Sequence, residues 1–274
     1  MGPIKHSGWT KIWTDISHLI FPNICLVCSN ELSIKEQHVC SFCNQNISVT
    51  NYHFFKEPTE MDKLFWGRVK VNATYAHLFF EKTKASQDIL FNLKYKNNQN
   101  LGVYFGKEMA KNIRHIEAFK NASVYIPVPL HPKKKFIRGY NQSEAIAKGI
   151  CNELEVEMKT ELLTRTKHTE TQTKKTRFQR WDNVSSVFRV NSAIKTHQHI
   201  VLVDDVLNSG TTLIYGVKHF LEVSLKQFKT AVLINRNHKK YPVKADFKGL
   251  SLSTTSHEHI HVDLDGKRMQ VVLE

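Results

Sequence analysis

The fold of this chain is decided by the stretch Ile200-Val-Leu-Val-Asp204-Asp205-Val-Leu-Asn-Ser-Gly-Thr-Thr212. Its first four residues are apolar and mostly β-branched, which predicts a buried strand of a parallel sheet that ends at Asp204 and Asp205. A short loop rich in hydroxyl groups follows, and apolar residues then recur at helical spacing from Leu213 to Leu221. The predicted order is therefore strand, acidic pair, glycine loop and helix.

This loop is suited to hold the phosphate of a sugar phosphate. Backbone N–H groups at a helix start carry the positive end of the helix dipole, and a glycine lets the loop fold closely around an anion. The residues expected to bind are Asn208, Ser209, Gly210, Thr211 and Thr212. An ordinary turn with helix-capping hydroxyls is the alternative.

The acidic pair needs a different role, because two carboxylates would repel the phosphate beside them. We expect Asp204 and Asp205 to accept hydrogen bonds from ribose hydroxyls or to assist a Mg²⁺ ion. Paired acids directly after a buried strand are costly without such partners. The thirteen residues resemble the 5-phosphoribosyl-1-pyrophosphate (PRPP) motif of type I phosphoribosyltransferases, although Asn208 stands where that family usually has a smaller residue.

Composition narrows the class of protein. A chain of 274 residues can bury an α/β core and still supply a small second module. No run approaches the ~18 apolar residues of a membrane span, and charges interrupt the N-terminal apolar positions, so we expect a cytoplasmic protein. The net charge of +14 favours polyanionic partners such as nucleic acid or ligands that carry pyrophosphate, and a generally basic soluble protein is the alternative.

Two CxxC pairs, Cys25 with Cys28 and Cys40 with Cys43, are separated by eleven residues. Each pair can bind a tetrahedral ion with neighbouring thiolates, so the spacing predicts a closed Cys₄ zinc site. Two disulfides are the alternative, which a cytoplasmic location disfavours. Four thiolates leave no open position for a substrate, so the zinc is expected to be structural.

A second buried strand is predicted from Val124 to Pro129, and a basic, glycine-containing loop follows it. Lys133, Lys134, Lys135 and Arg138 belong to this loop, which leads into a helix that carries Ile146 and Ile150. Such a loop can offer backbone amides and cations to a pyrophosphate. We expect Pro129, Leu130 and Arg138 to bind that group.

Three features together resemble the ComF family. They are the CxxC pairs after Phe21-Pro22, the Pro-Val-Pro-Leu-His131 segment with Arg138-Gly-Tyr-Asn-Gln142, and the run from Arg165-Thr-Lys-His-Thr-Glu-Thr-Gln172 to Arg177 and Asn183. The resemblance covers roughly residues 15–235. It implies an α/β type I phosphoribosyltransferase fold, a parallel sheet flanked by helices, with a small N-terminal zinc module. The family is linked to DNA uptake during natural competence, and its reaction is poorly defined.

The run from Arg165 to Asn183 has few large apolar residues and is expected to be a mobile segment. In related transferases such a loop closes over the donor and brings cations to the leaving pyrophosphate. The resemblance thus suggests a catalytic role for Arg165, Lys174, Lys175 and Arg177. A solvated basic loop is the alternative.

The last residues, from about 236, depart from the usual ComF ending. Alternating strands are predicted near His259 to Leu264 and Met269 to Leu273. The tail is similar to the ends of pyrimidine-operon regulators and purine phosphoribosyltransferases, in which an aromatic residue before a glycine flanks the base. Phe247 matches that residue and is expected to bind an acceptor base. The alternative is that its side chain only packs against other residues of the protein.

The expected organisation is a zinc-binding module in residues 1–50, a connecting segment in 51–83, and a phosphoribosyltransferase-like domain in 84–274. The leading hypothesis is phosphoribosyl transfer from PRPP with Mg²⁺. A module that binds single-stranded DNA and keeps a PRPP site as a switch or relic is a second hypothesis, since aromatic residues crowd the segment 50–83. A nucleobase transferase or RNA-binding regulator is the third, and a homo-oligomer stays open.

Overall fold

The computed structural model describes residues 22–82, 84–165, 188–191, 193, 199–207, 211–221, 225–236, 260–263 and 270–273. The chain divides into two compact units, Met1–Asn237 and His238–Glu274. In the second unit the described residues form one antiparallel pair, β8 (Ile260–Asp263) with β9 (Gln270–Leu273), near the predicted positions. None of the helices in the described ranges has the length and apolar character needed to cross a membrane.

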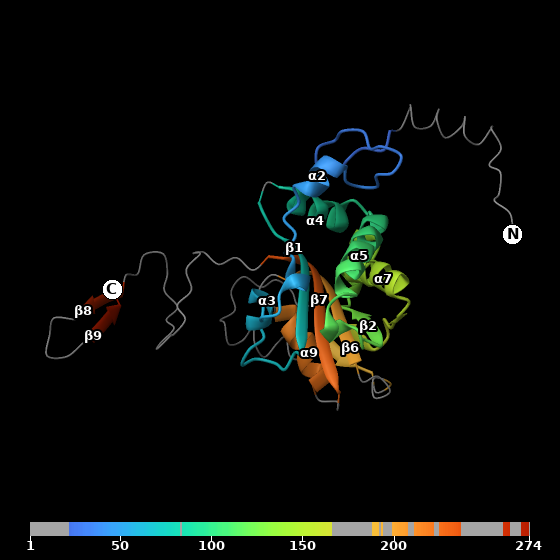
Figure 1. The fold of residues 1–274 in the computed structure, drawn as a ribbon. Helices are drawn as coiled ribbons and strands as arrows, with labels where there is room; N and C mark the ends of the chain where they lie inside the picture. Colours follow the sequence, from blue (N-terminus) through green and yellow to red (C-terminus); the bar gives the residue numbers. More distant parts are fainter. Residues whose placement is uncertain are drawn as a thin grey trace. The chain divides into compact units, whose positions relative to one another are not determined.

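The centre of the first unit is a parallel sheet of five strands in the order β1-β7-β6-β2-β3 (Figure 1). The strands are β1 (Ala73–Phe79), β2 (Val124–Pro127), β3 (Glu157–Met158), β6 (His199–Leu207) and β7 (Gln227–Asn235). In the register, Leu202 of β6 lies between Ile126 of β2 and Thr230 of β7. The central strands are rich in Val, Ile and Leu because helices cover both faces of the sheet.

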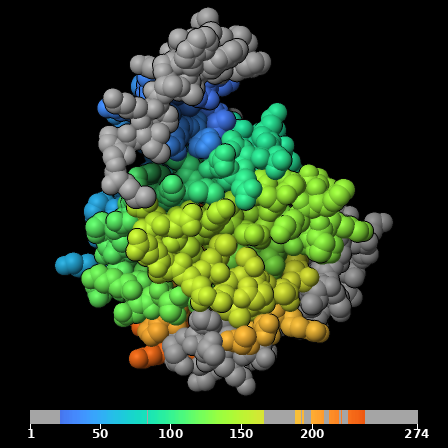
Figure 2. Space-filling model, turned by 90° about the vertical axis from the view of Figure 1, so that its right-hand side faces the viewer, coloured from blue at the N-terminus to red at the C-terminus, as the bar shows by residue number. Residues whose placement is uncertain are grey.

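Helices on opposite faces enclose this sheet. One face is covered by α4 (Ala85–Tyr95), α5 (Gln99–Ile113) and α7 (Gln142–Leu154), and the other by α9 (Thr211–Leu221) (Figure 1). The ring of Phe220 in α9 lies 5.2 Å from that of Phe228 in β7. On the opposite face, Asn112 of α5 donates a hydrogen bond to the Tyr75 hydroxyl of β1 at 3.1 Å. Figure 2 shows the surface that α4, α5 and α7 form.

Helices α5 and α7 pack through a pair of glycines. A Cβ atom on Gly106 would lie 2.2 Å from the carbonyl oxygen of Ile146, and one on Gly149 would lie 2.2 Å from that of Val103. Neither contact is sterically possible, so any larger side chain would push the two helices apart. This close packing fixes the start of α7, which carries residues of the candidate site described below.

The remaining elements are short. They are α2 (Ser41–Gln45), η1 (Tyr52–Phe54), α3 (Glu60–Lys63), η2 (Glu117–Phe119), α6 (Pro132–Arg138), β4 (Leu163–Arg165) and β5 (Phe188–Val190). Strands β4 and β5 pair antiparallel, with Arg165 opposite Phe188.

The outer edge of the sheet is covered by residues that follow the CxxC pairs. Val49 forms an antiparallel bridge with Leu78 of β1, and the Thr50 N–H donates to the His77 carbonyl at 2.9 Å. Covering an edge strand in this way blocks pairing with other chains. The segment 51–83, expected to connect two modules, therefore contributes strand β1 to the sheet itself.

Two local predictions were wrong. Strand β6 does not end at the acidic pair, because Asp204 and Val206 still pair with Val232 and Ile234 of β7. The basic segment predicted as a loop after β2 contains a helix, α6, whose first N–H groups are capped by the His131 ring through the Lys133 N–H at 3.2 Å. It ends where Gly139 adopts a left-handed conformation with φ of 79°.

Candidate active site at the carboxyl edge of the sheet

The strand order places the switch point of the sheet at the carboxyl ends of β2 and β6. From β2 the chain continues to β3 on one side, and from β6 it continues to β7 on the other side. Ligands of open parallel sheets bind where neighbouring connections diverge in this manner. The residues that follow β2 and β6 are those that the sequence predicts to bind pyrophosphate and sugar phosphate.

Asp204 is the buried member of the acidic pair, with 7% of its surface exposed. One carboxylate oxygen, Oδ1, accepts hydrogen bonds from the Ser143 hydroxyl at 3.0 Å and from the Asp205 backbone N–H at 2.9 Å. Burial, and then the neighbouring charge of Asp205, raise the pKa of Asp204 to about 8. A carboxyl group tuned to change its charge near neutral pH is typical of functional sites.

Asp205 pairs with a lysine from a distant part of the chain. The Lys94 ammonium, from the last turn of α4, lies 3.2 Å from Asp205 Oδ2. The side chains are only 20% and 15% exposed, respectively. This ion pair therefore differs from the solvent-screened pairs of a protein surface.

Further cations surround the pair. Desolvation, followed by the charges of Arg165, Arg138 and Lys94, lowers the pKa of Lys134, and Asp205 opposes this effect. Burial likewise lowers the pKa of Arg165, while the charge of Asp204 acts in the opposite direction. These mutual effects require the four cations and the acidic pair to lie close together. Two of them, Arg138 and Arg165, were predicted as site residues.

Tyr140 fixes the segment that carries Arg138. Its hydroxyl donates to the carbonyl oxygens of Leu93 at 2.6 Å and Asn98 at 3.1 Å. Burial, and secondarily the charge of Asp205, raise the pKa of Tyr140 to about 12. The hydroxyl therefore stays protonated and keeps the segment attached to the end of α4.

The other predicted residues are placed only in part. Pro129 and Leu130 lie half-buried between β2 and α6, and Thr211 begins α9 with Thr212 exposed beside it. Outside the described residues lie Asn208, Ser209 and Gly210 of the phosphate loop, Lys174, Lys175 and Arg177 of the basic run, and Phe247 of the tail. The phosphate loop is therefore seen only through its two flanking elements, β6 and α9.

Comparison with known proteins gives this arrangement a family context. Residues 140–267 match the family model described as the phosphoribosyl transferase domain. The fold is that of a type I phosphoribosyltransferase. The matched residues include the acidic pair and α7, whereas Lys94 and the CxxC pairs precede the matched range.

Individual relatives are similar over shorter stretches. Bifunctional protein PyrR from Bacillus mycoides and from Bacillus cereus are each 37% identical to this chain over 70 residues. The chain spans 39% of the length of these relatives, and the match covers 25% of the chain. Hypoxanthine phosphoribosyltransferase from Trypanosoma cruzi, in complex with the product IMP, is 17% identical with a TM-score of 0.34, covering 54% of this chain and 74% of that one.

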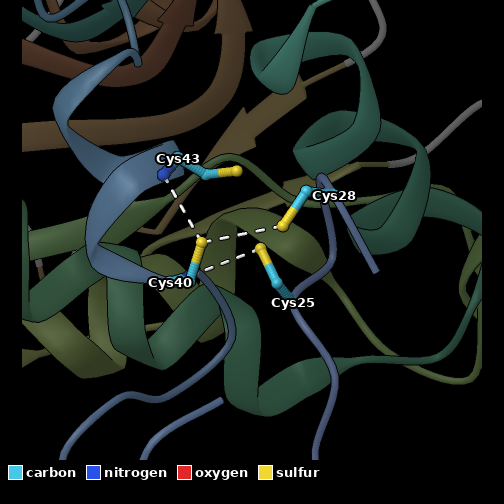
Figure 3. Close-up of side chains that lie close together, drawn as sticks. All are labelled: Cys25, Cys28, Cys40 and Cys43. Atoms are coloured by element: carbon cyan, nitrogen blue, oxygen red, sulfur yellow. Dashed lines mark hydrogen bonds between the residues drawn. The ribbon is translucent and has the colours of Figure 1, made fainter. Parts of the chain in front are cut away.

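The four cysteines that precede the phosphoribosyl transferase domain converge. Their sulfur atoms all lie within 4.8 Å of one another (Figure 3), and no cysteine forms a disulfide. The Sγ atoms of Cys28 and Cys40 are 3.7 Å apart. Tetrahedral zinc with Zn–S bonds of about 2.3 Å separates its sulfur ligands by about 3.8 Å. The cluster Cys25, Cys28, Cys40 and Cys43 therefore fits a metal such as zinc.

Backbone donors prepare this cluster for a cation. Burial alone would raise the pKa of Cys25. Hydrogen bonds from the N–H groups of Cys28, Cys40 and Val27 outweigh this effect and lower the pKa to about 6. Burial and the neighbouring thiols raise the pKa of Cys43 well above its usual range. The fifth cysteine, Cys151 in α7, lies elsewhere, and burial raises its pKa to about 12, in keeping with an inert core side chain.

A cleft of about 460 Å³ separates the cysteine module from α5. It is lined by Asn23, Ile24, Leu32, Glu36, Gln37, His38, Asn100, Val103, Tyr104 and Lys107. The His38 ring lies edge-on to that of Tyr104 at 5.5 Å and joins the module to the helix. None of these lining residues belongs to the cluster around the acidic pair.

Sequence reasoning missed two residues of this cluster. They are Ser143, at the start of α7, and Lys94, at the end of α4. The only sequence signal for Ser143 is Asn141, whose side chain caps α7 through the Ser143 N–H at 3.2 Å. No local pattern pairs Lys94 with Asp205, because their proximity depends on how α4 packs against the sheet.

Proposed function

We propose that the protein is a phosphoribosyltransferase that binds PRPP with Mg²⁺ and transfers its phosphoribosyl group. The observation that carries this proposal is the acidic pair at the carboxyl end of β6, surrounded by Lys94, Lys134 and Arg165 and followed by the helix α9. Such a site offers hydrogen-bond acceptors for hydroxyl groups beside cations for phosphate groups.

Each part of the donor has a matching part of the site. Asp204 and Asp205 would accept hydrogen bonds from the ribose hydroxyls. Residues 208–212, at the start of α9, would hold the 5′-phosphate with backbone N–H groups and hydroxyls. Pro129, Leu130 and Arg138, with Lys134, would face the pyrophosphate. Lys174, Lys175 and Arg177 are proposed to join Arg165 there.

The chemistry follows from the charges. The C1–O bond of the donor breaks, its electron pair leaves with the pyrophosphate, and the nucleophilic atom of the acceptor bonds to C1. The ribose passes through an oxocarbenium-like state, so cations placed at the departing group stabilise the transition state and no covalent nucleophile is needed. Carboxylate oxygens of the acidic pair suit Mg²⁺, which would neutralise pyrophosphate charge when bound.

A nucleobase is the acceptor that the comparisons support best. The relatives similar over 70 residues are PyrR proteins, and a solved hypoxanthine phosphoribosyltransferase holds IMP. Phe247 is proposed to flank the base. Screening uracil, hypoxanthine and guanine for pyrophosphate release tests this choice; no release with any base would direct the search to other acceptors.

Membership of the ComF family is a finer proposal. The cysteine module and the segment from Pro127 to Gln142 support it, and with it a role in DNA uptake with single-stranded DNA as partner. Counterion release makes such binding fall steeply with salt. A flat affinity for single-stranded DNA between low and moderate salt would exclude electrostatic binding, and sedimentation would show whether the protein is a homo-oligomer.

The cysteine module is proposed to hold one structural zinc ion. The sulfur geometry and the lowered pKa of Cys25 support this assignment. Because four thiolates close the coordination sphere, the zinc would organise the loops between Cys25 and Cys43 and would contact no substrate.

Calorimetry with PRPP and Mg²⁺ is the decisive experiment. The unchanged protein should bind PRPP, and Asp205→Ala should weaken binding at least about tenfold, the value of a hydrogen bond to a charged group. The Asp88→Ala variant, with the same loss of charge at a half-buried position of α4, serves as the control. Equal PRPP affinity of the Asp205 variant and the unchanged protein would contradict the proposed function.

A further inference from the structure

We propose that Lys94 is a donor-binding residue whose ammonium is shared between Asp205 and the diphosphate of the sugar donor. The inference rests on the proposed function and deepens it. Lys94 lies outside the part of the chain that matches the phosphoribosyl transferase domain, so that match assigns it no role.

The first argument is the burial of the ion pair. The Lys94 ammonium lies 3.2 Å from Asp205 Oδ2, and both side chains are more than three-quarters buried. Separating such a pair leaves an uncompensated charge in a poorly solvated place, which is strongly unfavourable. A ribose hydroxyl can therefore replace the Lys94 ammonium as the hydrogen-bond partner of Asp205 Oδ2 only if another anion pairs with that ammonium. The donor brings that anion in its diphosphate.

The second argument is the surplus of positive charge around Lys94. Its neighbours Lys134, Arg138 and Arg165 act on one another electrostatically, and among the residues that the structure describes, the acids that oppose them are Asp204 and Asp205. Lys135, on the same helix as Lys134, is partly balanced by Glu144 at 3.5 Å. A cluster with more cations than carboxylates is suited to a ligand with several negative charges.

The third argument is mechanical. The Tyr140 hydroxyl binds the Leu93 and Asn98 carbonyl oxygens, which flank the turn that carries Lys94. This hydroxyl thereby joins the end of α4 to the segment that follows α6.

Two further contacts strengthen this attachment. The Arg138 guanidinium lies 6.0 Å from the centre of the Tyr95 ring. Gly139 adopts φ of 79°, and a Cβ atom there would lie 2.7 Å from Asn97 Oδ1. Three consecutive residues, 138–140, thus contact the turn at 93–98. Lys94 and Arg138 consequently belong to one packed unit beside the acidic pair.

Complementing the helix dipole does not explain the position of Lys94. Lys96, two residues further along, also lies at the end of α4, and its ammonium stands over the Phe91 ring at 5.9 Å with its side chain exposed. A cation at the helix end needs only such an exposed place. The Lys94 ammonium instead lies against the Asp205 carboxylate.

The test separates the two halves of the donor. Calorimetry measures the binding of inorganic pyrophosphate and of ribose 5-phosphate to the full chain, to Lys94→Met and to the control Lys96→Met, all without divalent metal. In Lys94→Met, pyrophosphate affinity should fall about 10- to 100-fold, as expected for a charge-assisted hydrogen bond. Ribose 5-phosphate affinity should stay equal or rise, because no ammonium then competes for Asp205. The control should bind both ligands like the unchanged protein.

If Lys94→Met lost affinity for both ligands to the same extent, the role of Lys94 would be structural. If its pyrophosphate affinity were unchanged, Lys94 would not contact the diphosphate. Either result overturns the inference. If Lys94→Met does not fold, Lys94→Gln is measured with the same expectations. Failure of the proposed function looks different, because the unchanged protein would then bind neither PRPP nor either half of it.

Discussion

The Ser143 hydroxyl, in the first turn of α7, donates a 3.0 Å hydrogen bond to the buried carboxylate of Asp204 in the second half of β6. This bond joins the helix that follows the segment proposed to bind pyrophosphate to the strand that precedes the loop proposed to bind the sugar phosphate. Both ends of the candidate site therefore depend on one carboxyl group, whose charge is sensitive to pH.

The first prediction concerns that sensitivity. The pKa of Asp204 is about 8 in the folded protein, whereas an exposed aspartate has a pKa of about 4. The folded protein therefore binds the proton of Asp204 more tightly than the unfolded chain does. The resulting contribution to the free energy of unfolding is complete below a pH of about 4 and is lost as the pH rises through about 8. Urea unfolding at several pH values should show this decline, and Asp204→Asn should flatten it. A slope that persists in the variant would assign the effect to another group.

Tyr140→Phe should destabilise the protein and weaken pyrophosphate binding together. The variant loses the hydrogen bonds to Leu93 and Asn98, and each buried carbonyl left without its donor costs about 1 kcal/mol. Denaturant unfolding measures the loss, with the exposed Tyr95→Phe as the control. Full stability of Tyr140→Phe would mean that α4 is held by packing alone.

Removal of zinc should unfold the cysteine module while the sheet remains. A segment of this size has too little apolar core to stay folded without its metal. After chelation, hydrogen exchange should lose protection around Cys25 and Cys40 and keep it in β6 and β7. Metal analysis should find one zinc per chain, abolished by Cys43→Ser and retained by Cys151→Ser. Zinc binding by the Cys43 variant would refute the four-ligand site.

Lys229→Met should stabilise the protein. The side chain of Lys229, in β7, is fully buried, and its amine has no hydrogen-bond partner within the described part of the chain. Burial lowers the pKa of Lys229, so the unfolded chain binds the lysine proton more tightly than the folded protein does. The buried amine therefore reduces the free energy of unfolding at neutral pH, and this reduction becomes smaller as the pH rises toward the ordinary pKa of lysine.

Urea unfolding at pH 7 and at pH 10 tests this, since replacing an unpaired buried polar group should gain about 1–3 kcal/mol at neutral pH. The gain should be smaller at the higher pH. Exposed Lys226→Met should change neither value. A loss of stability in Lys229→Met would show that the amine has a partner.

The sequence predicts the elements that depend on local pattern. Strands around Val201 and Ile126 were expected from apolar β-branched runs, and both belong to the sheet. The cysteine spacing predicted the convergence of four sulfur atoms, which the structure confirms.

What the sequence hides depends on tertiary packing. Lys94 and Asp205 meet because α4 ends beside the sheet, and no spacing rule relates residues so far apart in the chain. The helix α6 was missed because three consecutive lysines resembled a loop, although His131-Pro132 is a typical helix start. Strand β6 extends beyond the acidic pair because β7 continues to pair with it as far as Asn235.

If the cysteine module holds zinc as proposed, the bridge between Val49 and Leu78 would link metal supply to solubility. Residues 47–50 leave the cysteine module and directly shield the outer strand of the sheet. Under zinc starvation this short strap would lose its anchor, and the uncovered hydrogen-bonding groups of β1 would become available to a neighbouring molecule. A metal far from the chemistry would thereby guard the protein against aggregation.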